Sequence, residues 1–161
     1  MKYLIQMHDA RNLHFDFRLQ IGSVLKSWVL PKGPSMSPKD KRLAILTEDH
    51  QLGYGNFEGV IPEGYGMGTV MLWDSGSFRN MRKNAAGKEI SLQTSFVDGH
   101  IDIWINGKKL KGGFSLIRFR PQNWLLVKQR DEYADDSYDI LTLAPRSVKS
   151  KKTLAELKKG V

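Results

Sequence analysis

The sequence contains no cysteine, so disulfide bonds, thiolate metal sites and cysteine nucleophiles are excluded. It also lacks any apolar run close to the roughly 20 residues that a membrane-spanning helix needs. The first residues are too polar for a secretory signal. These absences predict a cytoplasmic protein without membrane contact. A chain of 161 residues is nevertheless long enough to bury one hydrophobic core without metal or disulfide cross-links.

Acidic residues are too few to balance the basic ones. The chain has 17 Asp and Glu against 25 Lys and Arg, which gives a net charge of +8. Residues 146–161 hold six basic residues and one acid, and residues 108–130 hold seven basic residues and no acid. Clustered positive charge is typical of nucleic-acid binding, and a basic tail also serves simply to keep a protein in solution.

Short apolar runs separated by Gly and Pro dominate the first two-thirds of the chain. Asp98-Gly99 and Asn106-Gly107 are typical of hairpin turns. Many short strands with turns between them predict a mainly β protein, namely a compact β-barrel with a few short helices. The expected strands are residues 24–30, 43–47, 69–73, 91–97, 100–105 and 124–128.

The end of the chain carries the signals of one short helix. Thr153 and Glu156 have the spacing of a capping box, and Gly160 stands where a helix would end. The stretch before this helix has the composition of a linker. We therefore expect a β-barrel domain over residues 1–145, followed by a basic tail with a short C-terminal helix over residues 146–161.

Residues 13–19 alternate strictly between apolar and polar side chains. In a strand, this alternation places His14, Asp16 and Arg18 on one face. His, Asp and Arg are not the residues that usually fill a solvent-exposed strand face, so the set indicates a site. With His8 upstream, two imidazoles and a carboxylate would leave coordination positions open on a bound metal. The guanidinium of Arg18 beside them suits a phosphate.

Three functions are compatible with this pattern. The first is a metal-dependent phosphoesterase. The second is a 2-His-1-carboxylate iron oxygenase, in which His14 and Asp16 form the H-x-D element and His100 is the distant ligand. The third is a β-barrel that binds DNA ends without catalysis. Basic and imidazole side chains further along the chain favour phosphate chemistry: Lys32, Arg42 and His50.

Ten segments occur in the order of one known family: residues 8–19, 25–28, 31–35, 41–44, 48–50, 57–64, 68–70, 73–74, 109–112 and 124–128. Together they resemble the 3′-phosphoesterase domain of bacterial ligase D and its stand-alone archaeal relatives. The resemblance implies a compact β-barrel that binds manganese and processes DNA 3′ ends during strand-break repair. Two reactions are implied: removal of a 3′-phosphate and trimming of a 3′-terminal ribonucleotide.

The resemblance also implies roles for individual residues. The implied metal ligands are His8, His14 and Asp16. The implied catalytic residues are His50, Arg18, Glu48 and Tyr54, and the implied phosphate-binding residues are Arg18, Lys32, Arg42 and His50. The expected cofactor is Mn²⁺, and imidazole ligands also suit Zn²⁺ or another divalent ion. The expected partner is a DNA 3′ end on a primer–template, with any ligase or polymerase on a separate chain.

Longer members of that family carry an N-terminal arm upstream of the first histidine. Only seven residues precede His8 in this sequence. We therefore expect removal of a 3′-phosphate to be faster than trimming of a ribonucleotide, which needs the terminal ribose held in register.

Overall fold

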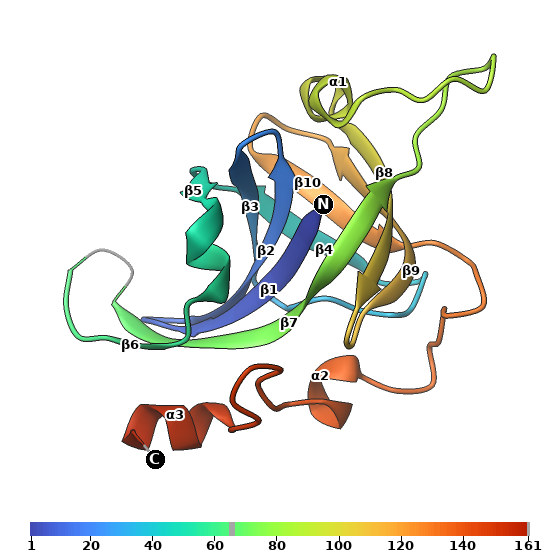
Figure 1. Ribbon diagram of the computed structural model, residues 1–161. Coiled ribbons are helices and arrows are strands. Elements are labelled where there is room, and N and C mark those ends of the chain that lie inside the picture. Colours follow the sequence, from blue (N-terminus) through green and yellow to red (C-terminus); the bar gives the residue numbers. More distant parts are fainter. Residues whose placement is uncertain (65–66, 161) are drawn as a thin grey trace.

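The computed structural model describes residues 1–64 and 67–160. It is a closed, eight-stranded antiparallel β-barrel with a few short helices, which confirms the predicted fold (Figure 1). The strands follow the order β1-β2-β3-β4-β10-β9-β8-β7, and pairing of β1 with β7 closes the barrel. The eight strands are β1 (Lys2–Asp9), β2 (Leu13–Ile21), β3 (Val24–Leu30), β4 (Lys41–Leu46), β7 (Gly68–Asn80), β8 (His100–Gly107), β9 (Lys111–Arg118) and β10 (Asn123–Lys128).

Short elements extend the barrel wall and cover it. Strand β5 (His50–Gln51) pairs with β3, and β6 (Gly59–Ile61) pairs with β7. The helical elements are the 3-10 helix η1 (Leu52–Asn56), α1 (Leu92–Asp98), α2 (Ile140–Leu143) and α3 (Leu154–Lys159). Among the described residues, none of these helices has the length and apolar content needed to cross a membrane.

Helix α3 begins and ends where the sequence predicts. The Thr153 hydroxyl accepts a hydrogen bond from the Glu156 backbone N–H, and the Glu156 carboxylate accepts one from the Thr153 N–H. Gly160 ends the helix in the left-handed conformation, with φ +71°. The capping box is therefore confirmed.

Helix α1 occupies a segment whose alternation predicts a strand, and that prediction is wrong. The Ser91 hydroxyl accepts a hydrogen bond from the backbone of the first helical turn, and Gly99 ends the helix with φ +76°. Leu92 and Ser95, three positions apart, are both buried, which is a helical spacing. The Asp98-Gly99 pair is therefore a helix end, because the capping residues at both ends outweigh a weak alternation.

The main hydrophobic core fills the barrel. Alternate residues of each strand point inward, so Phe15, Phe17 and Leu19 of β2 lie in this core as the sequence predicts. Leu13, assigned to the same face, is 48% exposed because it lies at the end of the strand. Three tryptophans are fully buried inside: Trp28, Trp73 and Trp124.

The outer face of one side of the barrel carries a second, smaller apolar cluster: Leu4, Leu25 and Leu72, covered by Leu52 of η1 and by Val148. Val148 also donates its backbone N–H to the Leu72 carbonyl. Lys149 donates from Nζ to the Asn56 carbonyl at 2.6 Å, and Lys158 of α3 forms an ion pair with Asp9. The segment before α3 is thus held on the barrel and is not a free linker (Figure 1).

Candidate active site

Three side chains that could hold a metal ion meet on the outer face of the barrel, where β1 pairs with β2. His8 stands directly opposite His14 in the register of the two strands, and Asp16 follows on the same face. The two imidazole rings are 4.9 Å apart, and the ligand atoms of the three residues all lie within 4.8 Å of one another. The antiparallel pairing of the two strands therefore assembles the predicted ligand set.

Backbone carbonyls orient both imidazoles of this set. His8 Nε2 lies 3.2 Å from the Met67 carbonyl, and His14 Nδ1 lies 3.2 Å from the Asn12 carbonyl. Since a carbonyl only accepts, these two nitrogens carry the ring protons. His8 Nδ1 and His14 Nε2 then face Asp16, at 3.9 Å and 3.5 Å from its carboxylate oxygens. Anchoring of the second ring nitrogen is typical of metal-binding histidines, so the donor set fits a divalent cation.

The cluster has an electrostatic signature of a paired acid and base. The hydrogen bond to Asp16 is the largest effect on His14 and raises the pKa of this imidazole, although burial opposes it. Burial alone raises the pKa of Asp16, but the His14 hydrogen bond and the charges of Arg18, His14 and His8 together hold it below its ordinary value. The carboxylate is therefore ionised at neutral pH, as a metal ligand must be.

Arg18 extends the cluster along β2 and is almost fully buried, with 3% exposure. Its Nη2 lies 3.5 Å from an Asp16 oxygen. Its Nε donates to Gln6 Oε1 and its Nη1 donates to Ser27 Oγ, both at 2.8 Å. The guanidinium is thus fixed in one orientation beside the ligand set.

His50 and Tyr54 reach Arg18 from β5 and η1. His50 Nδ1 lies 3.2 Å from Arg18 Nη1, and because arginine only donates, the neutral His50 ring carries its proton on Nε2. The Tyr54 ring lies 4.8 Å from the His50 ring and 5.1 Å from the guanidinium carbon. Burial, followed by the charge of Arg18, lowers the pKa of His50, so the ring is mainly neutral at neutral pH. Burial raises the pKa of Tyr54, which keeps its hydroxyl protonated.

Three predicted residues do not take part in the contacts described above. Lys32 is exposed in the turn after β3. Arg42 shares its face of β4 with the core residue Ala44, so it points to the inner side of the wall, and its Nη2 lies 3.6 Å from Asp40. Glu48 is exposed, and its charge and backbone carbonyl act on the pKa of His50. Their functional roles stay predictions.

Two buried polar residues, Gln6 and Ser27, also belong to the site, although the sequence analysis did not predict a role for them. Besides accepting from Arg18, Gln6 donates from Nε2 to the carbonyls of Tyr54 and Phe57, each at 3.0 Å. It therefore connects β1 and β2 to η1, which carries Tyr54, and to Phe57 directly after it. Gln6 could have been predicted from its position, because it lies two residues before His8 and so shares its face of the strand.

His100 lies elsewhere on the barrel. It begins β8, and its Nε2 lies 3.0 Å from Asp102 Oδ2. The imidazole that completes the set with His14 and Asp16 is His8. The proposed oxygenase ligand set with His100 is therefore wrong, because the register of β1 with β2, not a distant strand, supplies the second histidine.

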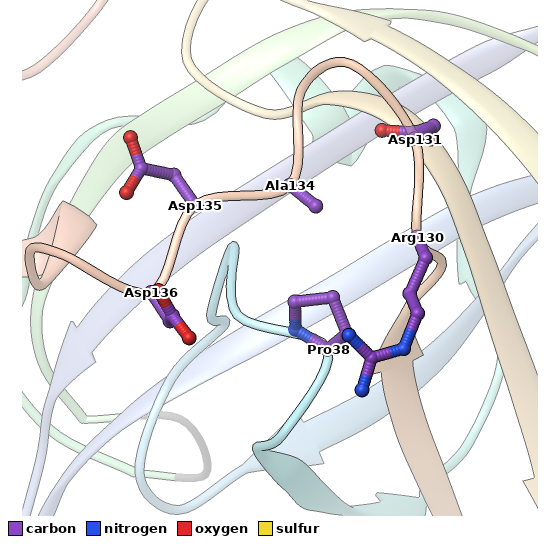
Figure 2. A pocket seen from close by; sticks show the side chains of 6 residues that line it. All are labelled: Pro38, Arg130, Asp131, Ala134, Asp135 and Asp136. Carbon is purple, nitrogen blue, oxygen red and sulfur yellow. The ribbon is translucent and has the colours of Figure 1, made fainter.

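A hollow that shares no residue with the cluster is lined by more acidic than basic side chains, so it does not suit a polyanion. The cavity has a volume of about 420 Å³. Figure 2 shows the side chains that line it, among them three aspartates and one arginine. Its lining residues are Pro38, Arg130, Asp131, Ala134, Asp135 and Asp136. A phosphate group would meet net negative charge there.

Residues 6–118 match the model of the DNA Ligase D 3′-phosphoesterase domain. The chain belongs to this family. The matched range contains the whole cluster of His8, His14, Asp16, Arg18, His50 and Tyr54. The match ends at Arg118, before the last barrel strand β10.

Relatives in several bacteria share this domain. The chain is 42% identical over 161 residues to the multifunctional non-homologous end joining protein LigD of Pseudomonas aeruginosa, covering 96% of this chain and 18% of that protein. It is 37% identical over 132 residues to LigD of Mycolicibacterium smegmatis, covering 81% of this chain and 17% of the relative. The chain therefore spans less than a fifth of the length of these relatives.

Proposed function

We propose that this protein is a divalent-metal-dependent phosphoesterase that removes the 3′-phosphate from DNA ends during strand-break repair. The observation that carries the proposal is the direct contact between the candidate metal ligands and Arg18, whose Nη2 lies 3.5 Å from Asp16. A cation site and a buried guanidinium side by side suit a doubly charged phosphate. Membership of the 3′-phosphoesterase family supports the reaction class.

The proposed metal is Mn²⁺, with Zn²⁺ or another divalent ion as alternatives. His8 Nδ1, His14 Nε2 and the Asp16 carboxylate would hold it, since these atoms lie close together. The other nitrogen of each imidazole is already hydrogen-bonded to a backbone carbonyl, which fixes the ring. When bound, a divalent ion supplies a Lewis acid for a phosphoryl oxygen. Three protein ligands leave coordination positions for the substrate.

Arg18 stabilises the negative charge that develops on the phosphoryl group. Its charge is permanent, and its burial strengthens the interaction because water is excluded. Gln6 and Ser27 hold the guanidinium in place before substrate arrives, so little reorganisation is needed during the reaction.

His50 acts in this proposal as a hydrogen-bond donor through Nε2–H. Its Nδ1 faces Arg18, so Nε2 is the nitrogen left to meet a phosphate oxygen or the leaving 3′ oxygen. The lowered pKa of His50 favours donation from a neutral ring over full proton transfer from an imidazolium. Tyr54, packed on the His50 ring, positions it and offers a second donor.

The proposed substrate is a DNA 3′ end on a primer–template. The net charge of +8 favours association with a polyanion. We further propose trimming of a 3′-terminal ribonucleotide as a second, slower reaction. Because the relatives are named for non-homologous end joining, we place the reaction in that repair, with a DNA ligase and a polymerase as partners that use the 3′-OH product.

The test is release of phosphate from a 3′-phosphorylated primer–template, with Mn²⁺ or with chelator. We expect release by the wild-type protein with metal, and loss of release in chelator and in the Asp16→Asn variant. Asp102→Asn is the matched control, since Asp102 pairs with His100 away from the cluster and should release phosphate at the wild-type rate. Equal release in chelator would contradict the metal mechanism. DNA binding without any release would favour the non-catalytic DNA-end-binding barrel.

A further inference from the structure

A cationic hollow of about 410 Å³ lies where the β8–β9 turn meets the segment after α2. Four positively charged side chains line it: Lys108, Lys109, Arg146 and Lys151. The remaining lining residues are uncharged, so within the described residues no acid lines the hollow. Its charge is the opposite of that in the hollow of Figure 2.

The β8–β9 turn that presents two of these lysines is rigidly held. Asp74 is fully buried, and its carboxylate accepts the backbone N–H groups of Lys108, Lys109 and Leu110, each at 2.9 Å. The Tyr3 hydroxyl donates to the same carboxylate at 2.8 Å. The lysines therefore project from a preorganised backbone rather than from a free loop.

Lys109 is the most constrained cation of the hollow. Its ammonium donates to the carbonyls of Ala144 at 2.9 Å and Arg146 at 2.5 Å, and lies 4.3 Å from the centre of the Trp73 ring. Burial lowers the pKa of Lys109 to about 8, Asp74 opposes this effect, and the charge of Lys151 adds to it. An anion in the hollow would relieve this crowding of positive charge.

The opposite wall of the hollow is also held in place. Arg146 Nη1 lies 3.2 Å from the Lys151 carbonyl and 3.3 Å from a Glu156 oxygen. Lys151 Nζ donates to the Val148 carbonyl at 3.2 Å. Lys108 and Lys151 have no ion pair with an acidic side chain in the part of the chain that the structure describes. Their charges are thus available to an external anion.

The same segment connects the hollow to the proposed active site. The Ser147 hydroxyl donates to Glu58, which follows η1 in the chain, and Lys149 donates to the carbonyl of Asn56 at the end of η1. Tyr54 of the active site belongs to η1. The hollow and the active site are therefore fixed relative to each other, as two contact points for one extended ligand require.

We propose that this hollow binds a backbone phosphate of the DNA duplex whose 3′ end occupies the active site. The inference rests on the proposed function, because it takes DNA to be the substrate. The lining of the hollow contains four cations and no acid, and although Glu156 pairs with Arg146, the remaining positive charge suits a phosphodiester. A second contact outside the active site would set the register of the duplex.

The first test compares two double variants with the same change in charge. Lys108→Gln with Lys151→Gln removes two charges from the hollow, whereas Lys83→Gln with Lys88→Gln removes two exposed charges from the turn before α1. Binding of a fluorescent duplex is measured by anisotropy across salt concentrations. If both lysines meet phosphates, the slope of log affinity against log salt falls by about 2 in the hollow variant and stays unchanged in the control. Equal slopes for the two variants would overturn the proposal.

The second test uses the wild-type protein and separates DNA from small anions. Lysine acetylation is mapped by mass spectrometry with duplex DNA or with inorganic phosphate at equal ionic strength. We expect DNA, and not inorganic phosphate, to protect Lys108 and Lys151. Equal protection by inorganic phosphate, or none by DNA, would overturn a DNA-backbone site.

A third measurement keeps this inference distinct from the proposed catalysis. A 3′-phosphorylated dinucleotide forms no duplex, so the hollow variant should hydrolyse it at the wild-type rate. A selective loss of rate on the dinucleotide would overturn the separation of the two sites. Failure of the wild-type protein to hydrolyse it would count against the proposed function, while the binding and protection tests still report on the hollow.

Discussion

Arg18 Nη1 lies 3.2 Å from His50 Nδ1, although 32 positions separate the two residues in the chain. The contact joins the barrel wall at β2 to β5, which pairs with β3 over the outer face. It orients His50 through the one nitrogen that does not meet the substrate in our proposal. A permanent charge and a hydrogen-bond donor are thereby set side by side next to the candidate metal ligands.

Replacing Arg18 by lysine should lower kcat by roughly 10²–10³-fold, as loss of a transition-state donor does. Lysine keeps the charge but cannot contact Gln6, Ser27 and His50 from one planar group. Initial rates of phosphate release measure the loss. Arg120→Lys, at an exposed position, is the control and should keep the wild-type rate. A fully active Arg18→Lys variant would show that the guanidinium geometry does not matter.

The neighbouring positions 14 and 15 should respond in opposite ways to truncation. His14→Ala should abolish activity and weaken metal binding with little effect on folding, because His14 lies on the outer face. Phe15→Ala should lower the free energy of unfolding by roughly 3–5 kcal/mol, because Phe15 is buried in the barrel core. Thermal melts and metal titrations of both variants distinguish the effects. Equal destabilisation by the two changes would argue against the assignment of the faces.

Metal affinity should fall as the pH is lowered through the pKa of His14, by about tenfold per pH unit, because a proton and the metal compete for Nε2. The pKa of His14 is raised by Asp16, so this loss begins at a higher pH than for an ordinary histidine. Titrations with Mn²⁺ at several pH values measure the effect, and His100→Asn is the control. An affinity that does not change between pH 8 and pH 6 would contradict His14 as a ligand.

In the metal-free protein, the folding stability that comes from the His14–Asp16 pair should increase as the pH is lowered from neutral to mildly acidic. The raised pKa of His14 contributes stability that is full below its unfolded-state pKa and is lost as pH rises through its folded-state pKa. The lowered pKa of Asp16 contributes stability above its unfolded-state pKa that is lost as pH falls through its folded-state pKa. In chelator-treated protein, the pair should therefore contribute most to the free energy of unfolding at mildly acidic pH. Thermal melts of wild type and His14→Ala across pH check this.

Ser147→Ala should lower the free energy of unfolding by about 1–3 kcal/mol, since it leaves the Glu58 carboxylate without one of its donors. Glu58 also accepts a hydrogen bond from the Leu72 backbone N–H at 2.8 Å. The substitution would therefore weaken the contact between β7 and the C-terminal segment. Ser150→Ala is the matched control, because Ser150 Oγ makes only a long 3.4 Å contact with the Lys152 N–H. Urea denaturation of both variants compares them. Equal stability of the two would show that the Ser147 contact is not needed to hold the segment.

Several features of this protein follow from local sequence. The alternation in residues 13–19 was sufficient to place His14, Asp16 and Arg18 on one face, because a strand repeats every two residues whatever surrounds it. The capping box at Thr153 is likewise a property of a few neighbouring residues. The sequence also predicts a hairpin next to Asn106-Gly107, but these two residues end β8 and the turn itself lies at residues 108–110. The mainly β class followed from many such short runs.

Other features were decided by tertiary structure, because they depend on which distant segments meet. Helix α1 formed where alternation predicted a strand, since its end caps and its packing on the core outweigh the pattern. His8 rather than His100 completes the ligand set because β1 pairs with β2 in a register that sets His8 opposite His14. Gln6 and Ser27 belong to the site because the buried guanidinium of Arg18 needs hydrogen-bond acceptors, and the fold places these two side chains beside it. The C-terminal segment lies against the outer face of the barrel, where Val148 covers the apolar cluster of Leu4, Leu25 and Leu72. Only tertiary structure decides this contact, because burial of that apolar surface needs segments that are far apart in the sequence.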